Sequence, residues 1–435
     1  MIEILSLLRV AAQSRQAALS GDDKAQILKI IAFQQSIIEA VAKNPEPFQP
    51  SVQLLAEYLG CSTSDSIARQ YANQMLDQYR AYLEKLGYLQ EGQGFQTVEQ
   101  WLGAINYVIQ RAPKYSGQQF PISSLFVFVM FTPSGAALFR LKEFNSLLTC
   151  VLQAWCVYLD SRDSRKVLIE PGGWLSEDAQ KALCLKQSTN YLCRHEPYWG
   201  FESFNAFFHR EYQLDKYRPL SGPGHDKVIV SANDGTVYRV ACDVKLCEAF
   251  WTKGQQYSLI DMLDGSPYTE SFICGDVLQS FLAGSDYHRW HAPISGKVLE
   301  ARVIPGLMFS ELLSKGFDIS AGTESQGYEA MVNTRGLIVI DNPEIGKVAV
   351  VPIGITEISS VTIEVSPGDH VKKGDEIGYF SYGGSSLALV FQKGMLKSFT
   401  AKKVKDPQKP NCKTVEDCQA SKGCLRVRAE VALAK

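Results

Sequence analysis

Four small residues near the C-terminus, Gly383-Gly384-Ser385-Ser386, have the types and order that a self-cleavage reaction needs. They stand between strand-like runs in GYFSYGGSSLALVF, where a tight turn or bulge is the plainer interpretation. Glycine permits the backbone angles that would present the carbonyl of Gly384 to the hydroxyl of Ser385. Attack by that hydroxyl would move the acyl group from nitrogen to oxygen, and β-elimination would then cut the chain. Ser385 would become an N-terminal pyruvoyl group, which is an electron sink built from the polypeptide.

A second stretch, Asp286-Tyr287-His288-Arg289-Trp290-His291-Ala292-Pro293, carries two imidazoles three positions apart. Imidazole titrates near neutral pH and can accept the proton of a hydroxyl, so His291 is the expected base for Ser385. For a lone histidine a structural role is the usual outcome. His288 is the more ambiguous of the two, because it could orient the loop or contact a substrate.

These stretches resemble the phosphatidylserine decarboxylase family. The resemblance covers about residues 200–435 and rests on motifs in the family's order: DYHRWHAPISG, the triplet Asn333-Thr334-Arg335, VVPIGITEISS, GDHVKKGDEIGYF and GGSS. Upstream, LDSRDSRKVL, GGWLSEDA and YWGFESFNAFFHR are similar to the soluble branch that contains the tryptophan decarboxylase of psilocybin biosynthesis. With that branch included, the resemblance runs from about residue 100 to the end.

The resemblance implies a decarboxylase that cleaves itself between Gly384 and Ser385. Decarboxylation of an amine needs a carbonyl group that forms a Schiff base with the substrate and takes up the electrons left by carbon dioxide. Pyridoxal phosphate (PLP) would need a lysine anchor and a phosphate-binding glycine loop, and the sequence offers no persuasive pair. We therefore expect a pyruvoyl group derived from Ser385, with no PLP and no metal.

The resemblance also implies a processing triad of Asp234, His291 and Ser385. Asp234, in Asn233-Asp234-Gly235, matches the family's Asp-Gly position and would hold the imidazole in the correct tautomer, as in serine hydrolases. An ordinary Asn-Asp-Gly turn is the competing interpretation. The Asp-Gly pair is typical of the lipid enzymes, whereas Glu357 in IGITEISS matches the tryptophan branch.

The expected substrate-binding residues come from the same motifs. In the triplet, the central residue is Thr where the family usually has Glu, which leaves the two flanking side chains as contacts, with a structural role equally open. The predicted set is Asn333, Arg335, Glu357, Tyr287 and Trp290.

The elements that must position these residues follow from the pattern of apolar side chains. Helical spacing over residues 1–110 and 121–159 predicts a helical N-terminal domain, residues 1–200. From Val228 onward, short β-branched runs separated by glycines predict a β-rich catalytic domain, residues 201–435, with barrel-sandwich-like hairpins. The expected fold class is α+β.

The composition of the chain limits the kinds of partner that it can bind. Hydrophobic residues make up 46% of the 435 and charged residues 21%, with a formal net charge of −2, so there is no electrostatic case for nucleic acid. Neither a membrane span nor a signal peptide is expected, which favours a soluble cytoplasmic protein. The sequence leaves any homo-oligomer open.

A rival interpretation comes from a different class of protein. APISGKV and VSPGDHVKKGDEIGYF resemble the two halves of a biotinyl- or lipoyl-type hairpin, which would make the chain a non-catalytic carrier or binding module. Lys372-Lys373 lies in a Gly-Asp turn without the residues that usually flank a carrier lysine, which disfavours this. In the polar tail, Cys412, Cys418 and Cys424 recur every six residues, and we favour reduced thiols over a disulfide or a weak metal site.

The sequence therefore predicts two non-covalently paired fragments, residues 1–384 and 385–435, that decarboxylate a free aromatic amino acid such as tryptophan. The alternative substrate is phosphatidylserine, with phosphatidylethanolamine as the product.

Overall fold

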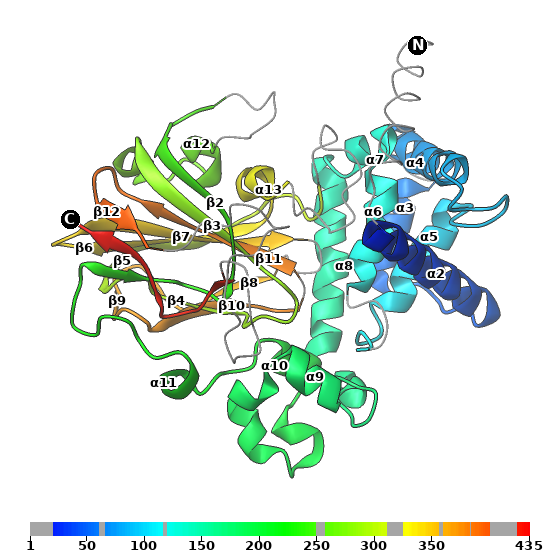
Figure 1. Ribbon diagram of the computed structural model, residues 1–435. Coiled ribbons are helices and arrows are strands. Elements are labelled where there is room, and N and C mark those ends of the chain that lie inside the picture. Colours follow the sequence, from blue (N-terminus) through cyan, green and yellow to red (C-terminus); the bar gives the residue numbers. More distant parts are fainter. Residues whose placement is uncertain are drawn as a thin grey trace.

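The computed structural model describes residues 21–60, 66–115, 120–248, 257–310, 325–355, 360–382, 384–400 and 424–435. Helices fill the first half of the described chain and strands dominate the second half (Figure 1). The expected α+β fold class is thus confirmed.

The N-terminal helices form where apolar residues recur at helical spacing. Proline begins α3, α6 and α7, and the hydroxyl of Thr97 accepts the amide proton of Gln100 at the start of α5. Every residue of α6 is buried, so this helix is the centre of the bundle. The helices are α2 (Gly21–Lys43), α3 (Pro50–Leu59), α4 (Ser66–Lys85), α5 (Val98–Val108), α6 (Pro121–Met130), α7 (Pro133–Leu138) and α8 (Lys142–Asp160).

One helix, Lys24–Lys43 within α2, is long and apolar enough by length and composition to cross a membrane. In the structure it packs on the bundle: Ile27 and Ile30 belong to the helical core, and Gln34 is buried. The side chain of Gln34 donates to the carbonyl of Ser124 at 2.7 Å and accepts from Tyr79 at 2.8 Å. These contacts anchor one face of the helix, and 28% of its apolar stretch is buried.

Short helices connect the bundle to the strands. Arg162–Val167 forms the 3₁₀ helix η1 shortly after α8. The remaining connecting elements are α9 (Glu177–Ala182), η2 (Leu185–Gln187), η3 (Thr189–Cys193), η4 (Pro197–Gly200), α10 (Phe204–Phe208) and α11 (Leu214–Tyr217).

An eight-stranded antiparallel sheet organises the second half, in the order β13-β2-β3-β11-β7-β6-β5-β9. Two three-stranded sheets, β1-β14-β12 and β4-β10-β8, accompany it. The strands are β1 (Val228–Val230), β2 (Gly235–Val244), β3 (Gly275–Leu282), β4 (Arg289–His291), β5 (Gly296–Ile304), β6 (Arg335–Asn342), β7 (Gly346–Ile355), β8 (Val361–Ile363), β9 (His370–Val371), β10 (Glu376–Phe380), β11 (Gly384–Phe391), β12 (Leu396–Phe399), β13 (Cys424–Leu425) and β14 (Glu430–Ala434). The helices of this half are α12 (Leu259–Met262), η5 (Thr269–Phe272) and α13 (Gln326–Val332).

Strand β11 carries Ser385 and separates two apolar cores. Leu387 and Leu389 pack in one core, together with Leu282 of β3 and Trp290 of β4. Ala388 belongs to the other core, which includes residues of α12 and α13. Because side chains alternate along a strand, Ser385 faces the first core and the β4-β10-β8 sheet.

The helical and β-rich halves meet in an aromatic cluster. Tyr382, three residues before Ser385, has ring contacts with Trp155 of α8 and with Phe204 and Phe208 of α10. The amide of Tyr382 donates to the side-chain oxygen of Asn205 at 3.2 Å. The helical half is therefore attached directly beside the residues of the predicted cleavage site.

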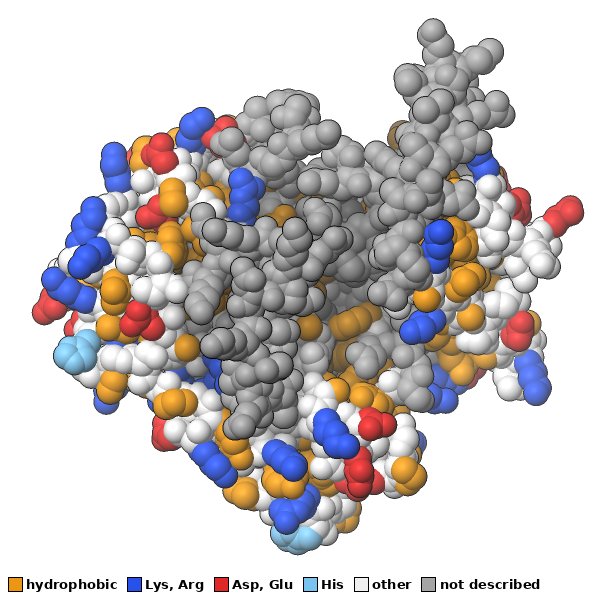
Figure 2. Space-filling view, in the orientation of Figure 1, with side chains coloured by type: hydrophobic (Ala, Val, Ile, Leu, Met, Phe, Trp, Pro, Cys, Tyr) orange, Lys and Arg blue, Asp and Glu red, His pale blue; other side chains and the backbone are white. Residues whose placement is uncertain are grey.

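The described surface carries both signs of charge. In Figure 2, basic and acidic side chains are mixed over both halves, with apolar side chains scattered among them. Among the described residues on this face, no basic patch stands apart from the acidic groups.

Candidate active site

Ser385 is the second residue of β11, opposite Leu282 of β3 and Gly354 of β7. Its side chain is fully buried, and its Oγ has no hydrogen-bond partner. Leaving a buried polar group unpaired costs about 1–3 kcal/mol, which is uncommon in a strand without a functional reason. The hydroxyl predicted to attack Gly384 is thus held in the centre of the sheet without competing hydrogen bonds.

Ser386 points to the opposite face and is fully hydrogen-bonded. Its Oγ accepts from Nε2 of Gln279 at 2.8 Å and donates to the carbonyl of Ser280 at 2.9 Å, with Oε1 of Gln326 at 3.3 Å. The hydroxyl of Tyr257 donates to Oε1 of Gln279 at 2.6 Å. This buried network anchors β11 one residue after the predicted cleavage point.

His288 lies on the side of the large sheet that Ser385 faces. The amide of Phe380 donates to the carbonyl of His288 at 3.0 Å, so the extended pairing of β4 with β10 continues to this residue. Alternation then places its side chain on the same side as Trp290, two residues later. The ring stacks on Phe208 at a centroid distance of 4.0 Å, and neither ring nitrogen has a partner in hydrogen-bond geometry. Burial lowers its pKa to about 3, so the imidazole is neutral.

His291 points to the other side of β4. Its Nδ1 lies 2.9 Å from the carbonyl of Gly374, which fixes the proton on that nitrogen. Nε2 is therefore an acceptor and receives the hydroxyl of Tyr287 at 3.0 Å. Burial lowers the pKa of His291 to about 4, so this imidazole is neutral as well.

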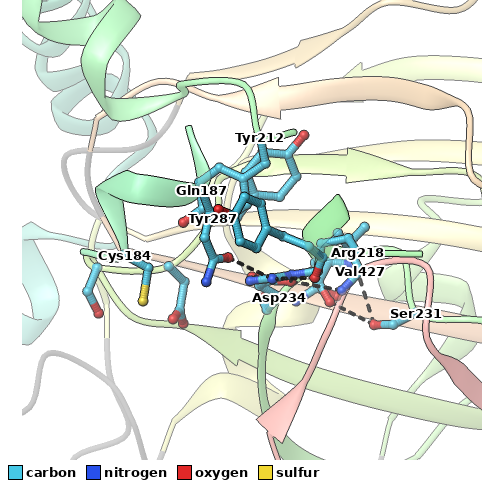
Figure 3. A network of polar contacts seen from close by, with 12 residues as sticks. Cys184, Gln187, Tyr212, Arg218, Ser231, Asp234, Tyr287 and Val427 are labelled. Atoms are coloured by element: carbon cyan, nitrogen blue, oxygen red, sulfur yellow. Dashed lines mark hydrogen bonds and ion pairs between the residues drawn. The ribbon is translucent and has the colours of Figure 1, made fainter. Parts of the chain in front are cut away.

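Asp234 does not orient His291, and here the structure differs from the predicted triad. Its carboxylate pairs with Arg218: Nε donates to Oδ1 at 3.0 Å and Nη2 donates to Oδ2 at 2.6 Å (Figure 3). The amide of Val427 donates to Oδ1 at 2.8 Å. Both charged side chains are almost fully buried. A guanidinium offers two parallel donors to a carboxylate, so it outcompetes a single imidazole N–H for this position.

Asp234 nevertheless belongs to a loop that connects β4, which carries His291, to β3 of the large sheet. The amide of His291 donates to the carbonyl of Ala232 at 2.8 Å. The hydroxyl of Ser280 in β3 donates to Oδ1 of Asn233 at 3.0 Å. The Arg218–Asp234 pair thus fixes a loop that contacts both β3 and β4.

The structure places the predicted substrate-binding residues in different surroundings. Asn333 is buried, and its amide donates to the carbonyl of Gly354, the residue opposite Ser385, at 3.0 Å. Arg335 donates to backbone carbonyls, including that of Met262 at 2.9 Å, and so ties β6 to α12. Trp290 is fully buried in the core between the sheets.

Tyr287 and Glu357 are the other two predicted substrate-binding residues. Tyr287 is hydrogen-bonded to His291 and has a ring contact with Tyr212 at 4.6 Å. Glu357 lies outside the described residues.

The sequence did not predict the hydrogen-bond partners that Asp234 and His291 have in the structure. Arg218 is not among the predicted site residues, although an arginine is the usual partner of a buried carboxylate. The carbonyl of Gly374 and the amide of Val427 are backbone groups, and no side-chain pattern identifies them. The sequence signal that could have identified Arg218 is the carboxylate of Asp234 itself, because a buried carboxylate needs a cationic partner.

The remaining sequence hypotheses have simple outcomes. Lys373 is buried, and its ammonium donates to the carbonyls of Gly222, His225 and Val228 at 2.7–2.9 Å, so it is not an accessible carrier lysine. No group of three metal-ligating side chains occurs within the described residues. Cys412 and Cys418 fall outside those residues, and the side chain of Cys424 does too.

Comparison with known proteins gives consistent matches. Two family models, both described as phosphatidylserine decarboxylase, match residues 49–183 and 204–413. The chain is 29% identical to an L-tryptophan decarboxylase of Psilocybe cubensis, over 84% of this chain and 93% of the relative. It is 35% identical to decarboxylase iboD of Amanita muscaria, over 62% of this chain and 83% of the relative. It is 32% identical to a phosphatidylserine decarboxylase proenzyme of Chlamydia trachomatis, over 66% of this chain and 86% of the relative.

These matches cover both halves of the chain, and the matched residues include Ser385, His288 and His291. The chain therefore belongs to the phosphatidylserine decarboxylase family, and it is a decarboxylase.

Proposed function

We propose that the protein cleaves itself between Gly384 and Ser385 and uses the resulting ketone to decarboxylate a free aromatic amino acid. The observation that carries this proposal is the Oγ of Ser385, buried in β11 without a hydrogen-bond partner beside a glycine. A pyruvoyl group formed there is covalently part of β11, so it needs no separate binding site. The orphaned hydroxyl and the absence of a bulky neighbour at position 384 fit this group.

Maturation begins when Oγ of Ser385 attacks the carbonyl carbon of Gly384 and loses its proton to a base. The bond from that carbon to the nitrogen of Ser385 breaks, and the nitrogen takes up a proton, which leaves an ester. A base then removes the α-proton of Ser385, and the bond between Cβ and Oγ breaks with the carboxylate of Gly384 as the leaving group. The resulting enamine becomes an imine, and water converts it to the ketone with release of ammonia.

His291 is the proposed base. Its Nδ1 proton is directed to the carbonyl of Gly374, its Nε2 lone pair accepts the hydroxyl of Tyr287, and the ring is neutral above about pH 4. Because the ring points to the other side of β4 from Ser385, the proton of Oγ has to reach it indirectly. Tyr287 donates to Nε2, so a proton reaching the tyrosine oxygen can be passed on to that nitrogen. Asp234 contributes indirectly, by holding the loop that accepts the backbone amide of His291.

His288 is assigned to the decarboxylation step. Once formed, the ketone accepts the substrate amine and takes up the electrons left by carbon dioxide. His288 lies on the side of β11 that this ketone faces, and its ring nitrogens have no partner in strict hydrogen-bond geometry, with the carbonyls of Ala283 and Gly284 near the ring. It can therefore hydrogen-bond the substrate, while Phe208 keeps the ring in place and excludes water.

The two fragments are expected to stay together after cleavage. Strand β11 belongs to the fragment 385–435 and is hydrogen-bonded along its length to β3 and β7 of the larger fragment. Strand β14 of the small fragment also pairs with β1 of the large one. Separation would expose the centre of the large sheet.

A free aromatic amino acid is the proposed substrate. The L-tryptophan decarboxylases align with most of this chain, including its helical half. That half packs with aromatic side chains against Tyr382, beside the cleavage site, which supports an enclosed apolar site. Phosphatidylserine is the second candidate, because phosphatidylserine decarboxylase proenzymes also match, over 45% and 66% of this chain.

One enzyme preparation distinguishes the two substrates. It is assayed for carbon dioxide release with tryptophan, tyrosine and phenylalanine in detergent-free buffer, and with phosphatidylserine vesicles. Release from an aromatic amino acid, and none from the vesicles, is the expected result. Turnover of the vesicles alone would assign the enzyme to the lipid. The Ser385→Ala protein is the control, since it cannot form the ketone.

A further inference from the structure

Arg210, which follows α10, is a buried cation without an acidic partner in the part of the chain that the structure describes. Its side chain is 2% exposed. The guanidinium donates to the carbonyls of Phe208 at 3.4 Å, Leu183 at 3.0 Å and Ser285 at 3.2 Å, and lies 3.4 Å from the hydroxyl of Tyr212. Its Nε has no hydrogen-bond partner.

Other buried or half-buried arginines of this protein are satisfied in a different way. Arg218 is paired with the carboxylate of Asp234, and Arg289 with that of Glu376. Arg335 also lies among carbonyls, but its Nε donates to Met262. Arg210 thus combines two features: its described partners are neutral, and one of its donors is unused.

This guanidinium contacts two segments that lead to the reaction site. Ser285, which accepts one of its hydrogen bonds, is three residues beyond Leu282, the residue opposite Ser385. Phe208, whose carbonyl accepts another, stacks on His288. The positive charge of Arg210 also contributes, after burial, to the low pKa of His288.

The nearest acidic group does not neutralise this charge fully. Asp286 accepts the amide of Ala283 at 2.8 Å, and burial together with the charge of Asp234 raises its pKa to about 7. At neutral pH this carboxyl is therefore only partly ionised. A guanidinium buried without a full counter-charge is costly, and a carboxylate that binds to it gains correspondingly.

We propose that Arg210 is the anion-binding residue of the active site and holds a carboxylate beside Ser385. The proposal rests on the self-cleavage and decarboxylation argued above, which supply two carboxylates at this place. One is the carboxylate of the amino-acid substrate, and the other is the new C-terminal carboxylate of Gly384, the leaving group of the elimination. A planar guanidinium with a free Nε–H suits either one, because Nε and a terminal nitrogen can bind both carboxylate oxygens.

The test uses the full-length protein with Arg210→Gln and Arg210→Lys, and with Arg302→Gln as the matched control. Arg302 forms exposed ion pairs with Glu300 and Asp264, so its loss removes a charge far from Ser385 in the sequence and the fold. Three quantities are measured: the rate of self-cleavage by intact mass, KM and kcat for tryptophan, and ligand-induced stabilisation of the uncleaved Ser385→Ala protein. The ligands for the last measurement are tryptophan and tryptamine, which differ in the carboxylate.

If the substrate supplies the carboxylate, Arg210→Gln raises KM at least tenfold with cleavage unchanged, and Arg210→Lys recovers part of the loss. In the Ser385→Ala background, Arg210→Gln then weakens stabilisation by tryptophan and leaves that by tryptamine unchanged. If Gly384 supplies it, Arg210→Gln slows cleavage at least tenfold, the uncleaved or ester form accumulates, and KM stays the same.

The proposal is overturned if Arg210→Gln behaves like Arg302→Gln in all three measurements. It is also overturned if Arg210→Gln and Arg210→Lys lose activity equally while tryptophan still stabilises the Ser385→Ala protein more than tryptamine does. A wild-type protein that never cleaves would instead contradict the proposed function, and the comparison of tryptophan with tryptamine would still decide on Arg210.

Discussion

At the scale of single residues, the unusual feature is a set of buried polar atoms that have no partners. Oγ of Ser385 and both ring nitrogens of His288 are buried without a partner in strict hydrogen-bond geometry, on the same side of the large sheet, and the carbonyls of Ala283 and Gly284 lie near the ring of His288. Natural cores rarely leave such groups unpaired, so their concentration in one place marks a site built for a reaction. His291 is different, since each of its nitrogens already has a partner.

Substitutions of His291 and His288 are expected to affect different reactions, self-cleavage for His291 and decarboxylation for His288. His291→Ala should slow self-cleavage by about 10²–10⁴-fold, the usual contribution of a general base. His288→Ala should cleave, because its role comes later, but should not release carbon dioxide. Intact mass follows the first reaction and gas release the second. Normal cleavage of His291→Ala together with blocked cleavage of His288→Ala would make His288 the base.

Cleavage should depend little on pH in the range where a free histidine titrates. Burial lowers the pKa of His291 from 6.5 to about 4, so the neutral, proton-accepting form is present at any pH above about 4. The rate should therefore fall only as the pH approaches 4. Asp286, whose pKa is raised to about 7, is the group expected to add an inflection near neutrality, and Asp286→Asn should remove it. A half-maximal rate near pH 6.5 in that variant would mean that His291 is solvated when it reacts.

At the scale of elements, the Arg218–Asp234 pair joins segments that are far apart in the sequence. Arg218 follows α11, Asp234 precedes β2, and Val427 lies between β13 and β14 (Figure 3). The loop carrying Asp234 also accepts the amide of His291. The carboxylate expected to orient an imidazole therefore acts by holding a loop.

Removal of one partner of this pair should be strongly destabilising. Arg218→Met leaves a buried carboxylate without a counter-charge, which costs about 3–5 kcal/mol. Adding Asp234→Asn should restore part of the stability, because the amide oxygen can still accept from Val427. Denaturant midpoints of the two variants give this comparison. An unchanged free energy of unfolding for Arg218→Met would show that the pair does not hold the loop.

The elements themselves could be predicted better than the contacts between them. Apolar spacing indicated the helices before residue 160, and glycine-separated β-branched runs indicated the strands after Val228, because both patterns are local. The motifs indicated Ser385 and the two histidines. The face to which each histidine points could not be predicted, since it depends on the pairing of β4 with β10. The partners of Asp234 and His291 are partly backbone groups, which any sequence can supply.

At the scale of the whole molecule, the helical half packs against the segment that precedes Ser385. Asn205 accepts the amide of Tyr382 and donates to Asp160 at the end of α8 at 2.9 Å, so it links α8 to the segment before Ser385. Phe208 extends the same contact to His288. The substrate pocket is therefore expected to be shared between the two halves, which accounts for relatives that align along both.

The central claim is that a single chain becomes two through Ser385. Intact mass under denaturing conditions, compared for the wild-type and Ser385→Ala proteins, tests it most directly. The wild type should give a fragment of residues 1–384 and a fragment of residues 385–435 whose N-terminus is a ketone, and the two should run together under native conditions. Ser385→Ala should give one full-length species without decarboxylase activity. A wild-type protein that remains full-length and still releases carbon dioxide would contradict the account.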